Sequence, residues 1–293
     1  MPLAVSCALV SSLLYALASV MQHRAARAQP QDTSMRWGLM LRLVRNRSWM
    51  VGIALDALAY ALQFVALAHA SLVLVQPLLV SGLLFALPLG AWLAGGRMTG
   101  RDWWGAVLLV IGLSLFLVVA SPGKGHDQAS ARGWIGLLVV TGVLICILVV
   151  LALGPERSNT RRRSTLLAAA AGINYGVTAA LTKAVAHLLH IGPSHVLASW
   201  ELYALIAGGV IGMLMASSAF QAGALDASLP MITVADPVAS ILIGALILGE
   251  SVRTGPLPTP LELLGLVLVI VGVVALSKAE VVRLVHDEAA ESS

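Results

Sequence analysis

Apolar segments in the first half of this chain recur in its second half at a constant distance of 160 positions. Four pairs keep this spacing: Tyr15 with Tyr175, Pro77 with Pro237, Gly105 with Gly265, and Gly112 with Gly272. An offset that survives several separate hydrophobic segments indicates the duplication of one structural unit. The chain is therefore expected to fold as two related halves.

The composition assigns both halves to a bilayer. Hydrophobic residues make up 59% of the chain and charged residues 11%, against about 25% charged residues in soluble domains. This inventory cannot cover a water-exposed surface, so a polytopic membrane protein of bacterial type is predicted. Cys7 and Cys146 lie in apolar segments and are interpreted as small packing residues. No disulfide and no zinc site is predicted.

Nine segments are apolar enough to cross the bilayer as helices of roughly 20 residues. The predicted spans are 3–22, 48–69, 71–94, 103–121, 134–153, 165–187, 196–222, 228–249 and 260–278. The segment 35–47 carries too many arginines to span, and Trp37, Leu41 and Val44 at helical spacing predict an amphipathic helix in the inner interface. A re-entrant segment is the alternative for this stretch.

The basic residues predict the orientation. Short cytoplasmic loops carry the excess of Lys and Arg, and an outer N-terminus places fourteen of the 18 basic residues on the inner side. The C-terminus is then cytoplasmic, and the expected location is the plasma membrane. This distribution explains the net charge of +4 without a nucleic-acid partner.

The orientation also inverts the second half. The first repeat covers residues 1–125, a linking helix lies in 126–163, the second repeat covers 164–280, and 281–293 form a cytoplasmic tail. Because the linking helix crosses the bilayer once more, the second four-helix repeat must have the opposite topology. The predicted fold is all-α, with nine transmembrane helices in two inverted four-helix repeats, which is typical of secondary transporters.

Polar residues in these helices mark a candidate cavity. A charged side chain at the bilayer centre costs at least about 2.5 to 3.5 kcal/mol, so each one needs a reason. Asp56 shares one helical face with Tyr60 and Gln63, and Asp236 shares another with its neighbours Thr233 and Ser240. The alternative is that each aspartate is a buried hydrogen-bond partner for a neighbouring helix.

The two repeat-equivalent prolines lie beside polar side chains, as Gln76-Pro77 and Asp236-Pro237. A proline frees the carbonyl four residues earlier, and broken backbone at this depth is tolerated where protein or water satisfies it. A packing kink is the alternative. With polar residues of the first and sixth spans, the substrate-binding prediction comprises Tyr15, Gln22, Asp56, Tyr60, Gln63, Gln76, Asn174, Tyr175, Thr178, Thr233, Asp236 and Ser240.

Three further sets of residues can be interpreted from their positions in the predicted spans. Lys183 corresponds to His23 and is expected to pair with a substrate anion or with Glu201, or to reach the interface. The histidines His187, His190 and His195 are interpreted as parts of a solvated outer loop, and Gly208, Gly209 and Gly212 as a helix-packing surface.

Three features of the second half carry a family resemblance: Ala224-Leu225, the run from Ala245 to Glu250, and the pair Gly265 and Gly272. In these features the chain resembles the drug/metabolite transporter superfamily of EamA-like permeases. It implies two inverted halves and transport of a small metabolite. The chain departs from the pattern because the end of the third span, 91–96, lacks an acid and each half has four helices rather than five.

A narrower resemblance is to NIPA-type magnesium transporters, through Asp56, Tyr60 and Pro77 and the basic stretch after the first span. It implies a hydrated divalent cation as substrate, with Asp56 and Asp236 as oxygen ligands.

The leading hypothesis is a secondary transporter that works by alternating access on an ion or solute gradient. Its partners would be the lipid bilayer and a small molecule or ion; a homodimer is left open. A transport-silent scaffold or regulatory subunit is the alternative from another class. An enzyme and a bound cofactor are not expected, because the chain has no nucleophile with a base at useful spacing, no HExxH and no phosphate-binding glycine loop.

Overall fold

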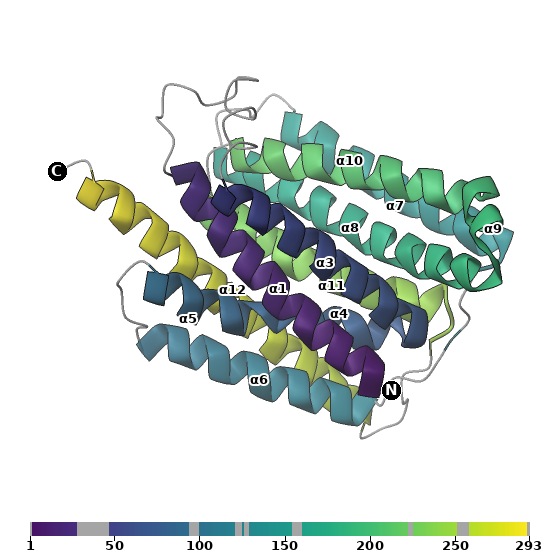
Figure 1. Ribbon diagram of the computed structural model, residues 1–293, viewed down its shortest axis with the longest axis horizontal. Helices are drawn as coiled ribbons and strands as arrows, with labels where there is room; N and C mark the ends of the chain where they lie inside the picture. The colour runs from purple at the N-terminus through teal and green to yellow at the C-terminus, as the bar shows by residue number, and fades with distance from the viewer. Residues whose placement is uncertain are drawn as a thin grey trace.

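The computed structural model describes residues 2–27, 47–93, 100–120, 125, 129–153, 160–221, 225–250 and 258–291, and these contain helices and no strand. The all-helical prediction is confirmed. The helices are α1 (Pro2–Arg27), α3 (Arg47–His69), α4 (Leu72–Val80), α5 (Gly82–Leu93), α6 (Gly100–Ala120), α7 (Ala131–Leu153), α8 (Thr160–Ile191), α9 (Pro193–Ala198), α10 (Trp200–Gln221), α11 (Leu225–Leu246) and α12 (Pro258–Glu291) (Figure 1).

Several helices can cross a bilayer. In the described ranges three of them, within α3, α7 and α8, hold apolar stretches long enough to span. Shorter apolar stretches of 10–17 residues lie in Pro2–Ala18, Leu72–Phe85, Trp103–Val119, Trp200–Ala216, Met231–Leu246 and Thr259–Ala275. The chain is thus a helical protein with several helices suited to a membrane, and the count of nine spans stays a prediction.

The predicted boundaries differ from the helices at three places. The span 71–94 is divided into α4 and α5. Helix α8 continues to Ile191, so that His187 and His190 are helical, and His195 lies in the short α9. Residues 281–291 extend α12, whereas the amphipathic segment 35–47 lies outside the described residues.

The break between α4 and α5 lies at Ser81, near a proline in each helix. Pro77 is inside α4 and Pro88 inside α5, and neither can donate a backbone hydrogen bond. The Ser81 hydroxyl and backbone N–H both turn back to the Leu78 carbonyl. The Ser81 hydroxyl also lies 3.3 Å from the Ser12 hydroxyl of α1. Local bonds therefore satisfy backbone groups at the break, and α1 contacts the break through the Ser12 side chain.

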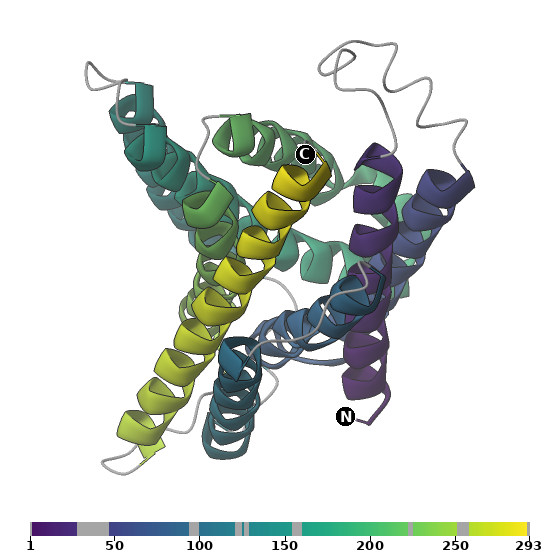
Figure 2. The ribbon, with the colours of Figure 1, turned by 90° about the vertical axis from the view of Figure 1, so that its left-hand side faces the viewer.

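Helix α8 is the centre of the bundle and packs against α3, α7, α10 and α11. Figure 2 shows α1 and α3 on one side of the molecule and α7 on the opposite side. Small residues permit this crowding: a Cβ added at Gly176 would lie 2.7 Å from the Ala239 Cβ of α11, and one at Gly212 of α10 2.6 Å from the Tyr175 ring. The packing role holds for Gly208 and Gly212, whereas Gly209 has open space around it.

Helices α6 and α12 meet through the repeated glycines. A Cβ at Gly112 would lie 2.5 Å from the Val269 backbone nitrogen, and one at Gly272 would lie 2.7 Å from the Leu109 backbone nitrogen. Leu109 and Val269 are themselves 160 positions apart, as Gly112 and Gly272 are. The two approaches are therefore equivalent under the 160-residue offset, with the places of α6 and α12 exchanged.

The Ser11 hydroxyl joins α1 to α3 by donating a 2.7 Å hydrogen bond to the Ala59 carbonyl, at a fully buried position. We expect Ser11→Ala to lower the free energy of unfolding by about 0.6–2 kcal/mol, the usual range for an interhelical bond in a membrane. The measurement is denaturation in detergent. Ser218→Ala is the matched control, because the Ser218 hydroxyl is exposed and bonds only within its own helix. Equal losses in both variants would contradict the prediction.

Candidate functional site

Polar side chains from α1, α3 and α11 gather around the Tyr15 hydroxyl. Tyr15 donates a 2.9 Å hydrogen bond to Gln63 Oε1. The charges of Asp56 and Asp236 also act on this hydroxyl, and Asp236 acts in the same way on Tyr175, the repeat equivalent of Tyr15. The two predicted aspartates thus belong to one electrostatic neighbourhood although 180 positions separate them in the chain.

A second chain of hydrogen bonds connects α3 with α8. The oxygens of the Tyr60 and Thr182 hydroxyls lie 3.1 Å apart. Because Thr182 already donates to the Thr178 carbonyl, Tyr60 is the donor in this pair. The Thr178 hydroxyl donates in turn to the Tyr175 carbonyl. The Tyr60–Thr182 contact joins the first half of the sequence to the second.

On α11 the Ser240 hydroxyl donates to Asp236 Oδ1 at 3.3 Å, one helical turn away. Ser240 is fully buried and Asp236 is partly exposed. We call the set Tyr15, Asp56, Tyr60, Gln63, Tyr175, Thr178, Thr182, Asp236 and Ser240 the polar cluster. Of these residues, only Thr182 lies outside the predicted binding set, although it belongs to the polar face of the sixth span.

Other residues of the predicted set lie elsewhere. Asn174 donates a 2.7 Å hydrogen bond to the Gly208 carbonyl of α10 and so serves helix packing. Gln76 is buried in α4 beside Pro77, and Thr233 lines a separate apolar cavity. Gln22 belongs to α1, but its side chain is outside the described residues. Glu201 is buried in the first turn of α10.

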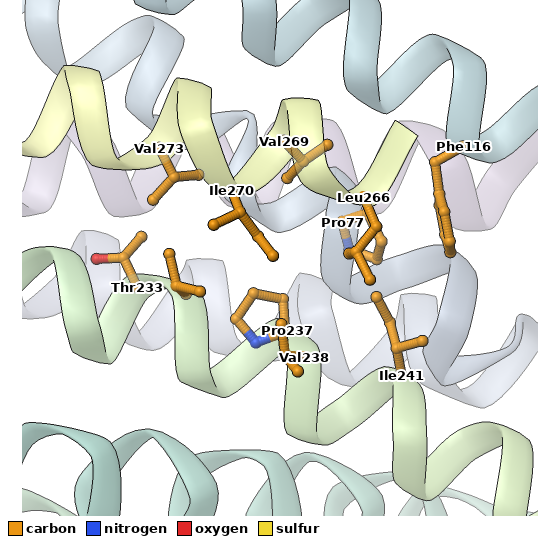
Figure 3. Close-up of a pocket in the computed structure, with 11 residues that line it drawn as sticks. Pro77, Phe116, Thr233, Pro237, Val238, Ile241, Leu266, Val269, Ile270 and Val273 are labelled. Atoms are coloured by element: carbon orange, nitrogen blue, oxygen red, sulfur yellow. The ribbon is translucent and has the colours of Figure 1, made fainter. Parts of the chain in front are cut away.

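Pro77 and Pro237 line the same cavity, which Figure 3 shows between α11 and α12 with Phe116 at one end. The other lining residues are Thr233, Val234, Val238, Ile241, Leu266, Val269, Ile270 and Val273. The cavity volume is about 10 Å³, which is roughly the space that one water needs. The two prolines therefore meet at an apolar seam rather than at a water-filled chamber.

Lys183 makes a buried ion pair with Glu250. Its Nζ lies 2.6 Å from Glu250 Oε1, and the two side chains are 3% and 0% exposed. The sequence predicts Glu201 as the acid partner of this lysine, and the structure pairs it with Glu250 instead. Its signal was the placement of an acid directly after a glycine at the end of an apolar segment.

The Glu250 carboxylate also caps α4. Oε1 accepts from the Leu72 N–H at 2.7 Å and Oε2 from the Val73 N–H at 2.8 Å. Unpaired N–H groups at a helix N-terminus favour a negative charge nearby. The side chain of the N-cap residue Ser71 makes no capping hydrogen bond to them. One carboxylate therefore stabilises the lysine and the start of α4 together.

Glycines create the space in which Glu250 lies. A Cβ at Gly244 would lie 2.5 Å from Glu250 Oε2, and one at Gly125 would lie 2.6 Å from the Glu250 backbone nitrogen. Gly249 has a φ of 59°, a left-handed conformation that glycine adopts most easily. The Glu250 N–H donates to the Gly244 carbonyl at 2.9 Å. The backbone thus turns sharply after α11 and directs the carboxylate back into the bundle.

The described residues contain no preformed metal site that would support the cation hypothesis. Within the part of the chain that the structure describes, no group of three or more His, Cys, Asp or Glu side chains is arranged to hold a metal ion. Asp56 and Asp236, the proposed oxygen ligands, come from α3 and α11.

The sequence is similar to that of a Corynebacterium glutamicum protein, the uncharacterized protein Cgl0250/cg0304. The two are 32% identical over 277 residues, which cover 94% of this chain and 95% of the relative. The two proteins belong to one family. The similarity extends through both halves of the chain. No family model and no solved structure matches the chain.

Proposed function

We propose that the protein is a secondary transporter of a small solute, with the polar cluster as its substrate site. The observation that carries the proposal is the position of the cluster. It unites tyrosines, aspartates and hydroxyl groups of both sequence halves, most of them buried or half-buried, in a bundle that otherwise exposes many large apolar side chains. Ionisable groups inside a membrane domain are costly and usually mark the path of a solute or proton.

The arrangement of the helices supports two inverted halves. Helices α1 and α8, which contain the equivalent tyrosines, run in opposite directions along the bundle (Figure 1). Helices α6 and α12 also meet through glycine contacts that are equivalent under the 160-residue offset. Transporters with inverted repeats place their substrate near the axis that relates the repeats.

In the proposed cycle, the two halves rock around the polar cluster and expose it to each side in turn. The basic residues place the N-terminus outside the plasma membrane and the C-terminus in the cytoplasm. Because no nucleotide-binding motif is present in the sequence, the energy would come from an ion gradient or from the gradient of the solute. Carboxylates are suited to bind a cation or a cationic group of the solute.

Replacing Asp236 with asparagine tests the assignment. A thermal-shift screen of the purified protein against magnesium chloride, the amino acids and ethidium selects the solute, because a ligand that binds the native state raises its apparent stability. We expect Asp236→Asn to reduce exchange of that solute at least about tenfold in liposomes, because one charge-assisted contact contributes about 1.5–3 kcal/mol.

Tyr203→Phe is the control for folding and reconstitution, because the exposed Tyr203 hydroxyl bonds the Leu197 carbonyl far from the cluster. Normal exchange by both Asp56→Asn and Asp236→Asn would reject the site.

Access of water to the cluster is a separate test that needs no solute. We expect a cysteine at Gln63 to react with a charged thiol reagent in a Cys7→Ala background. The native Cys146 is the control, because it lies on an apolar face of α7 and should remain unreactive in the bilayer. A cysteine at Gln63 that stays as unreactive as Cys146 would favour the transport-silent scaffold.

A further inference from the structure

We propose that Lys183 and Glu250 form a latch that closes one side of the bundle, and that this latch must open before a solute can reach the polar cluster from that side. The inference rests on the proposed transport function and adds a gate with a defined side. The latch connects three elements: α8 through Lys183, the turn after α11 through Glu250, and α4 through its first N–H groups.

The latch joins the two halves of the sequence. Glu250 belongs to the second half, whereas Leu72 and Val73 lie 178 and 177 positions earlier. The carboxylate accepts from two backbone N–H groups and one ammonium within 2.6–2.8 Å. Such charge-assisted bonds are short and strong. A relative movement of α4 and α11 must therefore break several bonds to one side chain at once.

The surroundings of the pair are dry. Leu72, Val75 and Leu248 are fully buried, and they belong to one apolar cluster with Leu67 and Ala184. A buried pair keeps both charges only while the partners stay together, because each charge alone needs water. Separation of the pair therefore requires entry of water at this end. This coupling makes the pair a switch between a closed, dry state and an open, hydrated one.

The position defines the side. The latch lies at the end of the bundle where α8 leads into α9 and where α4 begins (Figure 1). The basic residues of the sequence place that end outside the cell. The first half has no equivalent pair in its sequence, because His23 occupies the position of Lys183 and Gly90 that of Glu250. The duplicated halves thus differ in the residues that would close their respective ends.

The test uses a cysteine at Val75, which is fully buried in α4 two residues after Val73, whose N–H group Glu250 caps. The background is Cys7→Ala with Cys146→Ala, and the probe is a charged methanethiosulfonate applied to membrane vesicles of known orientation. We expect Glu250→Gln and Lys183→Met to raise the labelling rate at Val75 at least about tenfold from one side only. Lys183→Arg keeps the charge and should label at the rate of the parent protein.

Two controls separate opening from unfolding. The double variant Lys183→Gln with Glu250→Gln leaves no unpaired charge and keeps polar side chains that water can solvate, so it should fold and still show the increased rate. A cysteine at Ala168, fully buried near the opposite end of α8, should stay unreactive in every variant. An unchanged rate at Val75 in the double variant would overturn the latch, as would an increase from both sides or at Ala168.

Labelling needs no transported solute, so its result is independent of the exchange assay. If the variants increase labelling at Val75 but the parent protein exchanges no solute, the transport proposal is rejected and the gate is retained. Normal transport with no change in labelling would reject the gate alone.

Discussion

Lys183→Met is expected to lower the free energy of unfolding by about 3–5 kcal/mol, because it leaves the buried Glu250 carboxylate without its charged partner. The carboxylate keeps its bonds to the Leu72 and Val73 N–H groups, but these dipoles do not neutralise it. The loss can be measured by titrating the protein with denaturing detergent in mixed micelles. A loss of this size is a large part of the stability of an ordinary domain.

Removing both partners should cost less than removing one. In Lys183→Met with Glu250→Met no charge remains in the apolar surroundings, and replacing a buried ion pair by apolar residues is often nearly neutral. The remaining cost is the lost cap of α4, typically about 1 kcal/mol. A double variant that is less stable than Lys183→Met would contradict this explanation and indicate that packing, not charge, determines the effect.

Gly112→Leu is expected to be the second strongly destabilising substitution, with a loss of about 1–3 kcal/mol or more from overpacking. The new Cβ would lie 2.5 Å from the Val269 backbone nitrogen, so α6 and α12 must move apart along their contact. Gly272→Leu should cost about as much, because its Cβ would meet the equivalent backbone nitrogen of Leu109. The same detergent titration measures both.

Gly142→Leu is the matched control in α7. A Cβ at Gly142 has no neighbour within 4 Å, and leucine is a better helix former than glycine, so this variant should be neutral or slightly stabilising. Because Gly112→Leu and Gly272→Leu open the same contact, their effects should add incompletely. Full additivity would mean that the two glycines act at independent contacts.

The helices were predictable because length and hydropathy are local properties. The uninterrupted span 71–94 was not confirmed, since it divides at Ser81, where a residue distant in the sequence, Ser12 of α1, is in contact. Pro77 predicted a freed carbonyl, but not that Pro237 would lie at the same apolar cavity. The constant offset predicted that Gly112 and Gly272 are equivalent, and the structure adds that they bring α6 and α12 together.

Parts of the candidate site were predictable for the same reason. Helical spacing grouped Asp56 with Tyr60 and Gln63 on one face, and the structure gives Tyr60 and Gln63 separate partners, Thr182 and Tyr15. The spacing could not identify Glu250 as the partner of Lys183, because 67 residues separate them and the acid approaches from a turn rather than a helix face. Spacing within one helix also cannot distinguish Asn174, which donates a hydrogen bond to α10, from Thr178, which lies in the polar cluster.

The division at Ser81 has a consequence for biogenesis. Helix α4 has 9 residues and α5 has 12, which gives lengths of about 14 and 18 Å at 1.5 Å per residue, less than the hydrocarbon thickness of about 30 Å. In the proposed membrane protein neither piece is long enough to traverse the lipid by itself, so we expect both to be inserted as one unit. Since α1 supplies Ser12 at the joint, we expect this unit to settle only after α1 is already in the membrane, which gives the nascent chain an order of assembly.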